Sequence, residues 1–454
     1  MVISCVYFYF MLQSKEFIVV GAGPVGLSIA MLLKEQGYLV TIYEKRSDPR
    51  LNPEHGRSIN LALSHRGFKT LALLGLENKI KTLLAIPMHG RLVHDLEGNT
   101  QLQPYSSDGK AIYSVSRAGL NNLLVTEAEN KGLEIIFNSK CNGYDPAIKQ
   151  LHFEGFSIAA EHKSIIACDG AFSPLRNSLK ALPGFSHTEK KLEYGYKEFT
   201  IQSDASIWKI EKNALHIWPR KDFMLIALPN IDGSFTCTLF LRLKGEQSFE
   251  RLNTPETAKE FFTHYFKDAL PLMESFEEDL ELNPVSNIFM ETCFPWNLED
   301  NVLLLGDAAH AIVPFYGQGL NAGLEDVSLL MEEIKNSETS NAFNSFPQNR
   351  KKDTDAIGEL ALQNFIEMRD LVTDETFLLK KKLESKIKKL YPDKWKTQYE
   401  LVTFSDLPYS KAQTNGIEND KKLSVVLKNT QLTKHLLEET LTEQDMHSLS
   451  VIIL

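Results

Sequence analysis

Three acidic residues follow apolar runs at turns rich in glycine, and this arrangement suits the binding of a dinucleotide. Glu44 comes after LVTIY, Asp169 after SIIAC and Asp307 after NVLLLG. A carboxylate at the end of a buried strand can accept hydrogen bonds from sugar hydroxyls, and bare glycine backbone lets a phosphate or a flat ring approach. These three turns are therefore the first candidates for a cofactor site.

The stretch EFIVVGAGPVGLSIAMLLKEQGYLVTIYEK, residues 16–45, predicts a strand–helix–strand unit. Its glycines form G-x-G-x-x-G between the first strand and the helix: the first permits the turn, the second lets a pyrophosphate reach the backbone, and the third allows close packing. Glu44 follows eighteen residues after the last glycine, where a carboxylate can bind an adenosine ribose. We therefore predict a dinucleotide cradle formed by Gly21, Gly23, Pro24, Val25, Gly26 and Glu44.

No glycine fingerprint of this quality recurs, so the sequence predicts one cradle, for FAD or for NAD(P). The stretch GQGLNAGLEDVSLL predicts a helix whose free amides and positive dipole end would face an anion or an electron-rich ring. Taken alone, Asp307 is more simply a helix N-cap and the glycines are a plain turn. Taken together they favour the flavin half of FAD, bound by Asp307, Gly317, Gln318, Gly319, Leu320 and Asn321.

The elements that must hold these turns belong to an α/β protein. Residues 16–185 and 296–340 predict one discontinuous FAD-binding domain around a doubly wound, Rossmann-like sheet. Residues 186–295 contain alternating runs on either side of NIDG, which predict an antiparallel β-sheet substrate domain. Residues 341–454 predict a helical C-terminal region with a partly mobile tail.

Composition and charge exclude several classes of protein. A chain of 454 residues that is 43% hydrophobic can bury a large core, and its net charge of −10 argues against a nucleic-acid partner. The five cysteines show neither metal-ligand nor disulfide spacing, which favours a reducing compartment and no metal. No uncharged apolar run reaches the roughly 18 residues of a membrane span.

The first residues, MVISCVYFYFML, are apolar but too short to cross a bilayer. They also lack the basic region and the cleavage site of a signal peptide. Three interpretations stay open: a weak anchor, a first edge strand, or a stretch upstream of a natural start at Met11. We favour the last.

Three motifs occur in the order found in a known family. G-x-G-x-x-G is followed by D-G-x-x-S-x-x-R, which begins at Asp169 and ends at Arg176, and then by GDAAHAIVPFYGQGLN, which begins at Gly306. In these motifs the chain resembles the single-component flavoprotein aromatic hydroxylases. The resemblance implies a Rossmann-like FAD-binding domain of the aromatic hydroxylase type, with Asp169 as a further FAD-binding residue.

Within that group the chain resembles the kynurenine 3-monooxygenase family from about residue 16 to 410. Mitochondrial members carry a carboxyl-terminal membrane segment, whereas this chain has the polar stretch SKAQTNGIENDKK there. The resemblance therefore implies a bacterial, cytoplasmic member without an integral membrane segment. The blocks that carry it outside the flavin motifs are GRSINLALSHRG, HIWPRKDFMLIALPN, SFTCTLF, NFIEMRD and VTFSDLPY.

The resemblance also implies a substrate site. L-kynurenine is an amino acid with an anthraniloyl ring, so it needs an ion pair for its carboxylate and apolar walls for the ring. Arg91 matches the family's carboxylate-binding arginine, although alone it would be an ordinary strand arginine. Arg57 and Arg117 would join the cofactor site. The other implied substrate-binding residues are Tyr105, Phe240, Pro314, Phe315, Asn364 and Tyr409.

The implied reaction is the hydroxylation of L-kynurenine to 3-hydroxy-L-kynurenine by NADPH and O2 through a C4a-hydroperoxyflavin, without a catalytic side chain. The protein would position the ring and exclude water. Two alternatives stay open: a related FAD monooxygenase that acts on another aromatic acid, and a flavin-binding redox sensor without turnover. The sequence predicts no particular oligomeric state.

Overall fold

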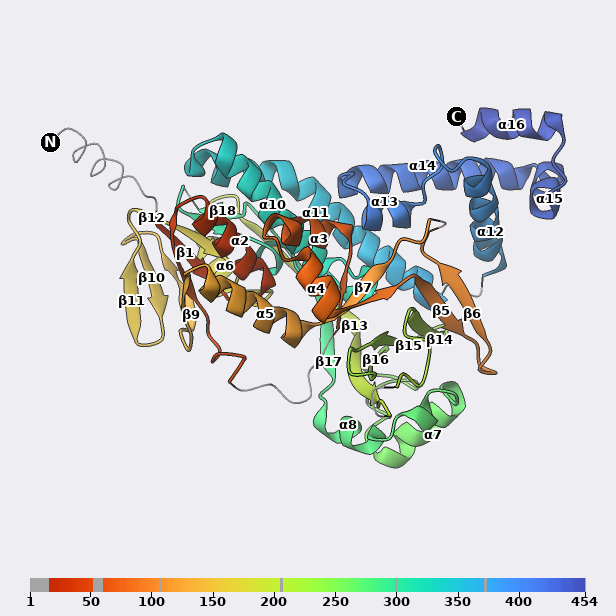
Figure 1. Cartoon of the computed structure of the whole chain (residues 1–454), viewed down its shortest axis with the longest axis horizontal. Coiled ribbons are helices and arrows are strands. Elements are labelled where there is room, and N and C mark those ends of the chain that lie inside the picture. The colour runs from red at the N-terminus through yellow and green to blue at the C-terminus, as the bar shows by residue number, and fades with distance from the viewer. Residues whose placement is uncertain are drawn as a thin grey trace.

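The computed structural model describes residues 16–51, 60–106, 108–204, 207–298, 300–370 and 374–453. Residues 1–15, with the proposed start at Met11, and the predicted cofactor residue Arg57 lie outside the described residues. Two large sheets and a set of C-terminal helices make up the fold (Figure 1).

The first large sheet has six strands in the order β18-β19-β12-β1-β2-β8. Its strands are parallel except β18, which pairs antiparallel with β19. Strands β19, β12 and β1 are buried along almost their whole length and therefore read as largely apolar runs, whereas burial alternates along β2. The bounds are β1 Glu16–Val20, β2 Leu39–Tyr43, β8 Glu134–Ile136, β12 Lys163–Ala167, β18 Asn297–Leu298 and β19 Val302–Leu304.

Helices and two small sheets surround this sheet. Helix α10 packs against both α2 and α3, and α2 packs against α5. The small sheets have the orders β3-β7-β4 and β11-β10-β9. The helices are α2 Pro24–Glu35, α3 His65–Leu73, α4 Glu77–Leu83, α5 Arg117–Asn130, α6 Pro174–Ser178, α9 Asp307–His310 and α10 Gly319–Asn336. The strands are β3 Asn60–Leu63, β4 Ala85–Met88, β7 Ile112–Ser116, β9 Cys141–Asp145, β10 Gln150–Phe153 and β11 Phe156–Ala159.

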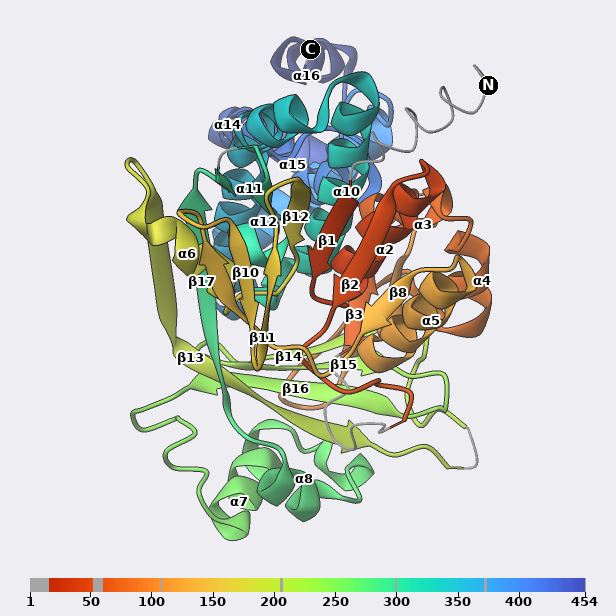
Figure 2. The same ribbon diagram turned by 90° about the vertical axis from the view of Figure 1, so that its left-hand side faces the viewer.

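The second large sheet has seven strands in the order β17-β13-β16-β15-β14-β5-β6. Helices α7 and α8 lie beneath its long strands, on the side away from the six-stranded sheet (Figure 2). Strands β5 and β6 come from the segment before residue 185, so this sheet is not built from residues 186–295 alone. The bounds are β5 Gly90–His94, β6 Thr100–Pro104, β13 Ser186–Ile201, β14 Leu215–Pro219, β15 Met224–Pro229, β16 Phe235–Arg242, β17 Ser286–Phe294, α7 Pro255–Tyr265 and α8 Phe276–Leu282.

The C-terminal region is helical. Helix α11 packs against α10 and α14, and the later helices share an apolar cluster that includes Leu383, Trp395 and Val426. The residues expected to form a partly mobile tail therefore lie in helices with a common core. Across the described residues, no helix combines the length and the apolar character that a membrane span requires. The helices are α11 Thr339–Asp370, α12 Glu375–Leu390, α13 Gln398–Phe404, α14 Tyr409–Lys428, α15 Thr430–Glu438 and α16 Glu443–Ile453.

Candidate active site

The turn between β1 and α2 places its three glycines in different surroundings. Gly21 has φ +106°, and a Cβ there would lie 2.3 Å from the carbonyl oxygen of Cys168. A Cβ on Gly26 would lie 2.0 Å from the carbonyl oxygen of Gly21. By contrast, a Cβ on Gly23 would meet no protein atom within 4 Å. Packing therefore requires the outer two glycines, and the middle glycine keeps its backbone open to a ligand.

The two residues inside this motif start the helix and connect it to the third turn. Pro24 is the first residue of α2, where its missing N–H costs no helical hydrogen bond. The Val25 side chain packs against Gly306 and Gly323, where added Cβ atoms would lie 3.4 and 2.8 Å from it. Gly323 did not enter the sequence prediction, although it is needed for α10 to approach α2 this closely.

Glu44 braces the turn from the end of β2. Its side chain is buried and accepts hydrogen bonds from the Ala22 N–H at 2.7 Å and from Arg46 Nε at 2.8 Å. The backbone N–H of Arg46 also donates to this carboxylate at 3.0 Å. Glu44 is thus a hydrogen-bond acceptor beside the glycine turn, at the place where the motif predicts a ribose.

Asp169 follows β12, next to Gly21. Its Oδ1 atom is buried without a hydrogen-bond partner, and burial raises its pKa to about 6 despite the hydrogen bond from Ser173. Leaving a buried carboxylate oxygen unpaired is costly, so the site is incomplete without a ligand that can donate to it. The Ser173 side chain caps α6 by accepting from the Arg176 N–H at 2.9 Å.

Arg176 is buried, and other parts of the protein bind its guanidinium group. Its guanidinium donates to the carbonyl of Ala308 at 3.1 Å and forms a 2.9 Å ion pair with buried Glu291. Only 3% of the residue is exposed. It therefore joins the second motif to the third and to β17, and it presents little surface to a nicotinamide cofactor.

The third motif bends sharply before Asp307. Gly306 has φ +62°, and its N–H donates to Asp326 at 3.2 Å. Asp326 also holds His310, with 2.7 Å between Nε2 and Oδ2. Asp307 itself remains accessible to solvent, yet the surrounding protein desolvates it enough to raise its pKa. The charge of Arg117, an exposed residue at the start of α5, opposes this rise, which places Arg117 near the carboxylate.

The glycine turn before α10 is held by Asn321. Gly317 has φ +66°, the left-handed conformation that favours glycine. The buried Asn321 amide donates to the carbonyls of Ala62 and Gly317 at 2.8 Å each and accepts from the Ser64 N–H at 2.9 Å. Its side chain is therefore fully used, so only its backbone is free for a cofactor. The half-buried Gly319 and Leu320 form the first turn of α10.

Arg91 lies among three tyrosines. Its guanidinium carbon is 5.2 Å from the ring centre of Tyr399 and 5.8 Å from that of Tyr105, and Tyr399 also stacks with Tyr316. The Arg91 Nε and the Tyr105 hydroxyl are buried without hydrogen-bond partners. We call Arg91, Tyr105, Tyr316 and Tyr399 the arginine cage. A cation with an unused buried donor among aromatic faces can bind an anion.

Among the described residues, Glu367 is the carboxylate whose charge acts on Arg91, and Glu367 and Glu384 both act on Tyr316. Burial acts to lower the pKa of Arg91, but Tyr105, Tyr399 and Glu367 oppose this, and the net pKa is raised. Glu367, on α11, is 3.4 Å from Lys381 of α12. Neither Glu367 nor Tyr399 was predicted as a site residue, although each lies in or next to a sequence block that carried the family resemblance.

An apolar wall adjoins the cage. Phe315 stacks on Phe365 with 4.0 Å between ring centres and lies 5.0 Å from Phe240. Asn364 is buried, and its amide donates to the Phe315 carbonyl at 2.7 Å. Pro314 is exposed at the edge of this wall. The structure thus brings together four of the predicted substrate residues, namely Phe240, Pro314, Phe315 and Asn364.

Tyr409 occupies a different position from the one predicted. It is fully buried, with its ring 4.0 Å from the Arg66 guanidinium, and its hydroxyl donates to Gln318 Oε1 at 3.0 Å. The cage position near Arg91 belongs instead to Tyr399, ten residues earlier in the chain. Tyr409 can therefore affect a ligand only through Gln318.

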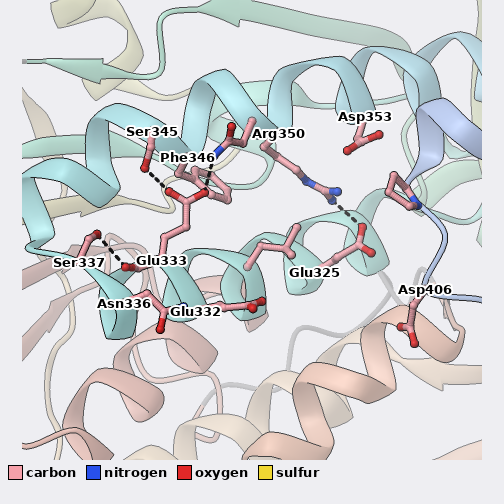
Figure 3. A pocket seen from close by; sticks show the side chains of 13 residues that line it. Glu325, Glu332, Glu333, Asn336, Ser337, Ser345, Phe346, Arg350, Asp353 and Asp406 are labelled. Atoms are coloured by element: carbon pink, nitrogen blue, oxygen red, sulfur yellow. Dashed lines mark hydrogen bonds and ion pairs between the residues drawn. The ribbon is translucent and has the colours of Figure 1, made fainter.

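A pocket of about 500 Å³ between α10 and α11 lies apart from these groups (Figure 3). Glu325, Glu333 and Asp353 line it, and Arg350 pairs with Glu325 at 2.7 Å. None of its lining residues belongs to the glycine turns or to the arginine cage. Its carboxylates also repel a phosphate or a carboxylate, so we place the active site at the turns and the cage.

Comparisons with known proteins show which family the chain resembles. A family model described as an FAD binding domain matches residues 15–346. The kynurenine 3-monooxygenase of Cytophaga hutchinsonii is 44% identical over 91% of this chain and 94% of its own length. That of Dictyostelium discoideum is 42% identical over 92% and 94%. The chain belongs to the kynurenine 3-monooxygenase family.

Membership of the kynurenine 3-monooxygenase family makes the protein a FAD-dependent monooxygenase and confirms the predicted cofactor and fold class. Solved structures agree on the fold. A 2-methyl-3-hydroxypyridine-5-carboxylic acid oxygenase has a TM-score of 0.65 at 19% identity, over 79% of this chain and 93% of that chain. PqsL of P. aeruginosa has a TM-score of 0.64 at 17% identity, over 78% and 97%.

The residues present fit FAD, as members of the kynurenine 3-monooxygenase family require. The open face of Gly23 leaves room for a pyrophosphate, and the unpaired Asp169 Oδ1 atom can accept a hydrogen bond from the cofactor. Asp307 and the first turn of α10 offer a carboxylate and free amides for the other half of the cofactor.

Proposed function

We propose that the protein hydroxylates L-kynurenine to 3-hydroxy-L-kynurenine, with NADPH and O2 as co-substrates. The observation that carries this proposal is the arginine cage, where half-buried Arg91 has a buried Nε donor without a partner beside a wall of stacked aromatic rings. An aromatic amino acid matches both features. The names of the relatives support the same substrate.

Recognition of the amino acid would use two opposite charges, that of Arg91 in the arginine cage and that of Glu367, which acts on Arg91. The Arg91 guanidinium binds the substrate carboxylate, and the Tyr105 hydroxyl donates to the same group. Glu367 accepts from the α-ammonium group, since it is the carboxylate whose charge acts on Arg91. Phe240, Phe315 and Phe365 hold the ring, which orients one edge toward the flavin side of the site.

The cofactor would be held by the three turns. Gly23 and Glu44 bind the adenosine and pyrophosphate half, and Asp169, Asp307 and the α10 amides bind the remainder. FAD, when bound, would supply the redox chemistry, namely acceptance of a hydride from NADPH and activation of O2 for transfer to the ring. Exposed Arg117 beside Asp307 is the residue we propose for a transient NADPH contact.

The work of the side chains is then to bind, orient and exclude water. The substrate's own amino group activates the ring carbon ortho to it, so no side chain need act as a general base there. The buried aromatic wall keeps water from the reacting atoms, because water would divert activated oxygen to hydrogen peroxide. Asn364 fixes the wall by holding the Phe315 carbonyl.

The test is to measure NADPH oxidation, hydrogen peroxide and 3-hydroxykynurenine together, with L-kynurenine and with other aromatic acids in turn. Kynurenine should stimulate NADPH oxidation and yield the hydroxylated product. Product from a different aromatic acid, with none from kynurenine, would favour the related-monooxygenase alternative. Anaerobic NADPH that bleaches the flavin at the same rate with and without kynurenine would favour the redox sensor.

A further inference from the structure

A chain of buried polar side chains lies behind the strand that carries Arg91. Because side chains alternate along a strand, Arg91 and His94 of β5 lie on opposite faces of the seven-stranded sheet. His94 stacks on Trp218 with 4.0 Å between ring centres. Its Nε2 atom lies 2.9 Å from Nδ1 of His216 on β14. His94 is 5% exposed and His216 is fully buried.

Both outer ends of this histidine pair meet hydrogen-bond acceptors. His216 Nε2 lies 2.7 Å from the backbone carbonyl oxygen of Glu211. His94 Nδ1 lies 2.8 Å from Asp268 Oδ2, which also accepts from Trp218 Nε1 at 2.9 Å. Burial acts to raise the pKa of Asp268, but the hydrogen bonds from His94 and Trp218 outweigh it, and the net pKa is lowered. Asp268 is therefore ionised.

The donors and acceptors fix the number of protons. His216 Nε2 must carry a proton because a carbonyl oxygen only accepts, and His94 Nδ1 must carry one because it faces a carboxylate. The contact between the two rings needs a third proton. Two neutral imidazoles carry two protons in all, so the pair holds one more than that.

We propose that His94 and His216 share one excess proton, with Asp268 as the counter-ion, and that this buried charged pair fixes the end of β5 and so positions Arg91. The two histidines are positioning residues, since they touch neither cofactor nor substrate. The effect on Arg91 rests on the proposed function, whereas the proton count does not.

The surroundings of the pair decide where the charge resides. Burial and the neighbouring His94 lower the pKa of His216 to about 4, and the Asp268 carboxylate lies on the His94 side of the pair, 2.8 Å from Nδ1. The charged groups that act on His216 from the packed elements are Glu211 and Asp268. Asp268 also acts on Arg220, together with Asp95 and Glu97.

The pair is placed to control the strand. β14 and β5 run parallel, with Leu215 opposite Arg91, and the two imidazoles join these strands on the far face. Arg220 holds the same end of β5 by donating to the carbonyls of His94 and Asp95 at 3.0 Å each. Loss of the excess proton would leave two ring nitrogens facing each other without a hydrogen, and β5 would shift.

The proton count can be measured in the FAD-loaded protein with ¹⁵N-labelled histidine. His94→Gln and His216→Gln assign the signals. We expect three protonated nitrogens and one unprotonated nitrogen from the pair at pH 7, and a second unprotonated nitrogen once the pH exceeds the pair's midpoint. Two unprotonated nitrogens at pH 7 would overturn the shared proton.

The functional part is tested with Asp268→Asn, which removes the charge but keeps an acceptor for His94 and Trp218. In the wild type, KM for L-kynurenine should rise at least threefold through the midpoint seen by NMR, with a smaller change in kcat. In Asp268→Asn the midpoint and the rise in KM should both move to lower pH by about one unit. The exposed Asp222→Asn is the matched control and should leave both profiles unchanged.

Two results would overturn the positioning role: superimposable KM profiles for wild type and Asp268→Asn, or a KM rise at a pH unrelated to the NMR midpoint. If the wild type does not hydroxylate kynurenine at all, the proposed function fails, and the NMR count still decides the shared proton. The failures of the two proposals are thus distinguishable.

Discussion

Arg91 is the residue on which substrate binding should depend most. If its guanidinium pairs with the substrate carboxylate in the cage, Arg91→Ala should reduce kcat/KM for kynurenine by about 2–5 kcal/mol, as truncation of one side of a desolvated ion pair does. The measurement is steady-state hydroxylation at several substrate concentrations, together with the FAD content, which should stay normal.

The control for this change is Arg251→Ala, which removes an exposed arginine that follows β16 in the chain. It should leave kcat/KM within a factor of two. Wild-type kinetics for Arg91→Ala, or loss of FAD from it, would show that the substrate carboxylate is bound elsewhere or that Arg91 supports the fold.

At the scale of elements, the turn between β1 and α2 separates ligand binding from stability. Gly23 has φ −78°, and a Cβ there would meet no protein atom within 4 Å, so Gly23→Ala should fold normally. The added methyl group would occupy the space proposed for the pyrophosphate. We expect unchanged unfolding of the apoprotein and FAD affinity at least tenfold weaker, measured by urea titration and by flavin fluorescence.

Gly26→Ala, in the same turn, should have the opposite effect and reduce stability. Its Cβ would lie 2.0 Å from the Gly21 carbonyl oxygen, so this variant should lose stability with or without FAD. Equal FAD affinity in Gly23→Ala and the wild type would contradict the proposed position of the cofactor.

Helix α14 meets the loop before α10 through one hydrogen bond, from the Tyr409 hydroxyl to Gln318. Tyr409→Phe removes this bond but keeps the ring packed beside Arg66. We expect a stability loss of about 0.5–1.5 kcal/mol and a larger share of NADPH diverted to hydrogen peroxide, because Gln318 would lose its fixed orientation beside the flavin site. NADPH, peroxide and product should be measured in one reaction.

The control is Tyr391→Phe, which changes a half-buried tyrosine after α12. It should change neither the stability nor the share of NADPH diverted to hydrogen peroxide. A strictly proportional loss of NADPH oxidation and hydroxylation in Tyr409→Phe, without extra peroxide, would mean that Tyr409 governs flavin reduction instead.

At the scale of the whole molecule, the unpaired Oδ1 atom of Asp169 should affect how the free energy of unfolding depends on pH. Its pKa in the folded protein is raised to about 6, so its contribution to stability is complete below about pH 4 and is lost as the pH rises through 6. Asp169→Asn should therefore stabilise the apoprotein at pH 8 by about 1–2 kcal/mol and have little effect near pH 4. Urea unfolding at both pH values is the measurement.

The control for that experiment is Asp393→Asn, an exposed residue between α12 and α13, which should show no such difference. With saturating FAD the advantage of Asp169→Asn should disappear or reverse, because the ligand would supply the missing donor. A stability advantage for Asp169→Asn of equal size at both pH values would contradict the raised pKa.

The fold class and the three turns were predictable because they depend on local patterns: apolar strands, glycines at fixed spacing and acids at strand ends. The roles of individual side chains were less predictable from the sequence. Asn321 was predicted as a cofactor residue, yet its amide is used entirely by Ala62, Ser64 and Gly317. Tyr399, and not Tyr409, stands beside Arg91, because which of two tyrosines faces a site depends on how α13 and α14 pack.

The histidine pair and Glu367 also escaped prediction. His94 and His216 are far apart in the sequence and meet through the parallel pairing of β5 with β14, and Asp268 reaches His94 from the segment after α7. Residues in a block that resembled the family, such as Glu367, were visible but had no assigned role. Long-range pairing therefore sets the limit of what one sequence predicts here.

The order of strands in the six-stranded sheet has a consequence for synthesis on the ribosome. β1 pairs with β12, and β12 in turn pairs with β19, so the sheet closes only after Val302–Leu304 has been made. The last cofactor turn follows at Gly317–Asn321. Because domains form as the chain emerges, amino end first, a nascent chain stalled before residue 300 would leave one edge of the apolar strand β12 without its neighbour β19 and could not retain a flavin. FAD would then bind only late in the synthesis of the protein. A shortage of riboflavin would therefore affect a chain that has already left the ribosome or is about to leave it.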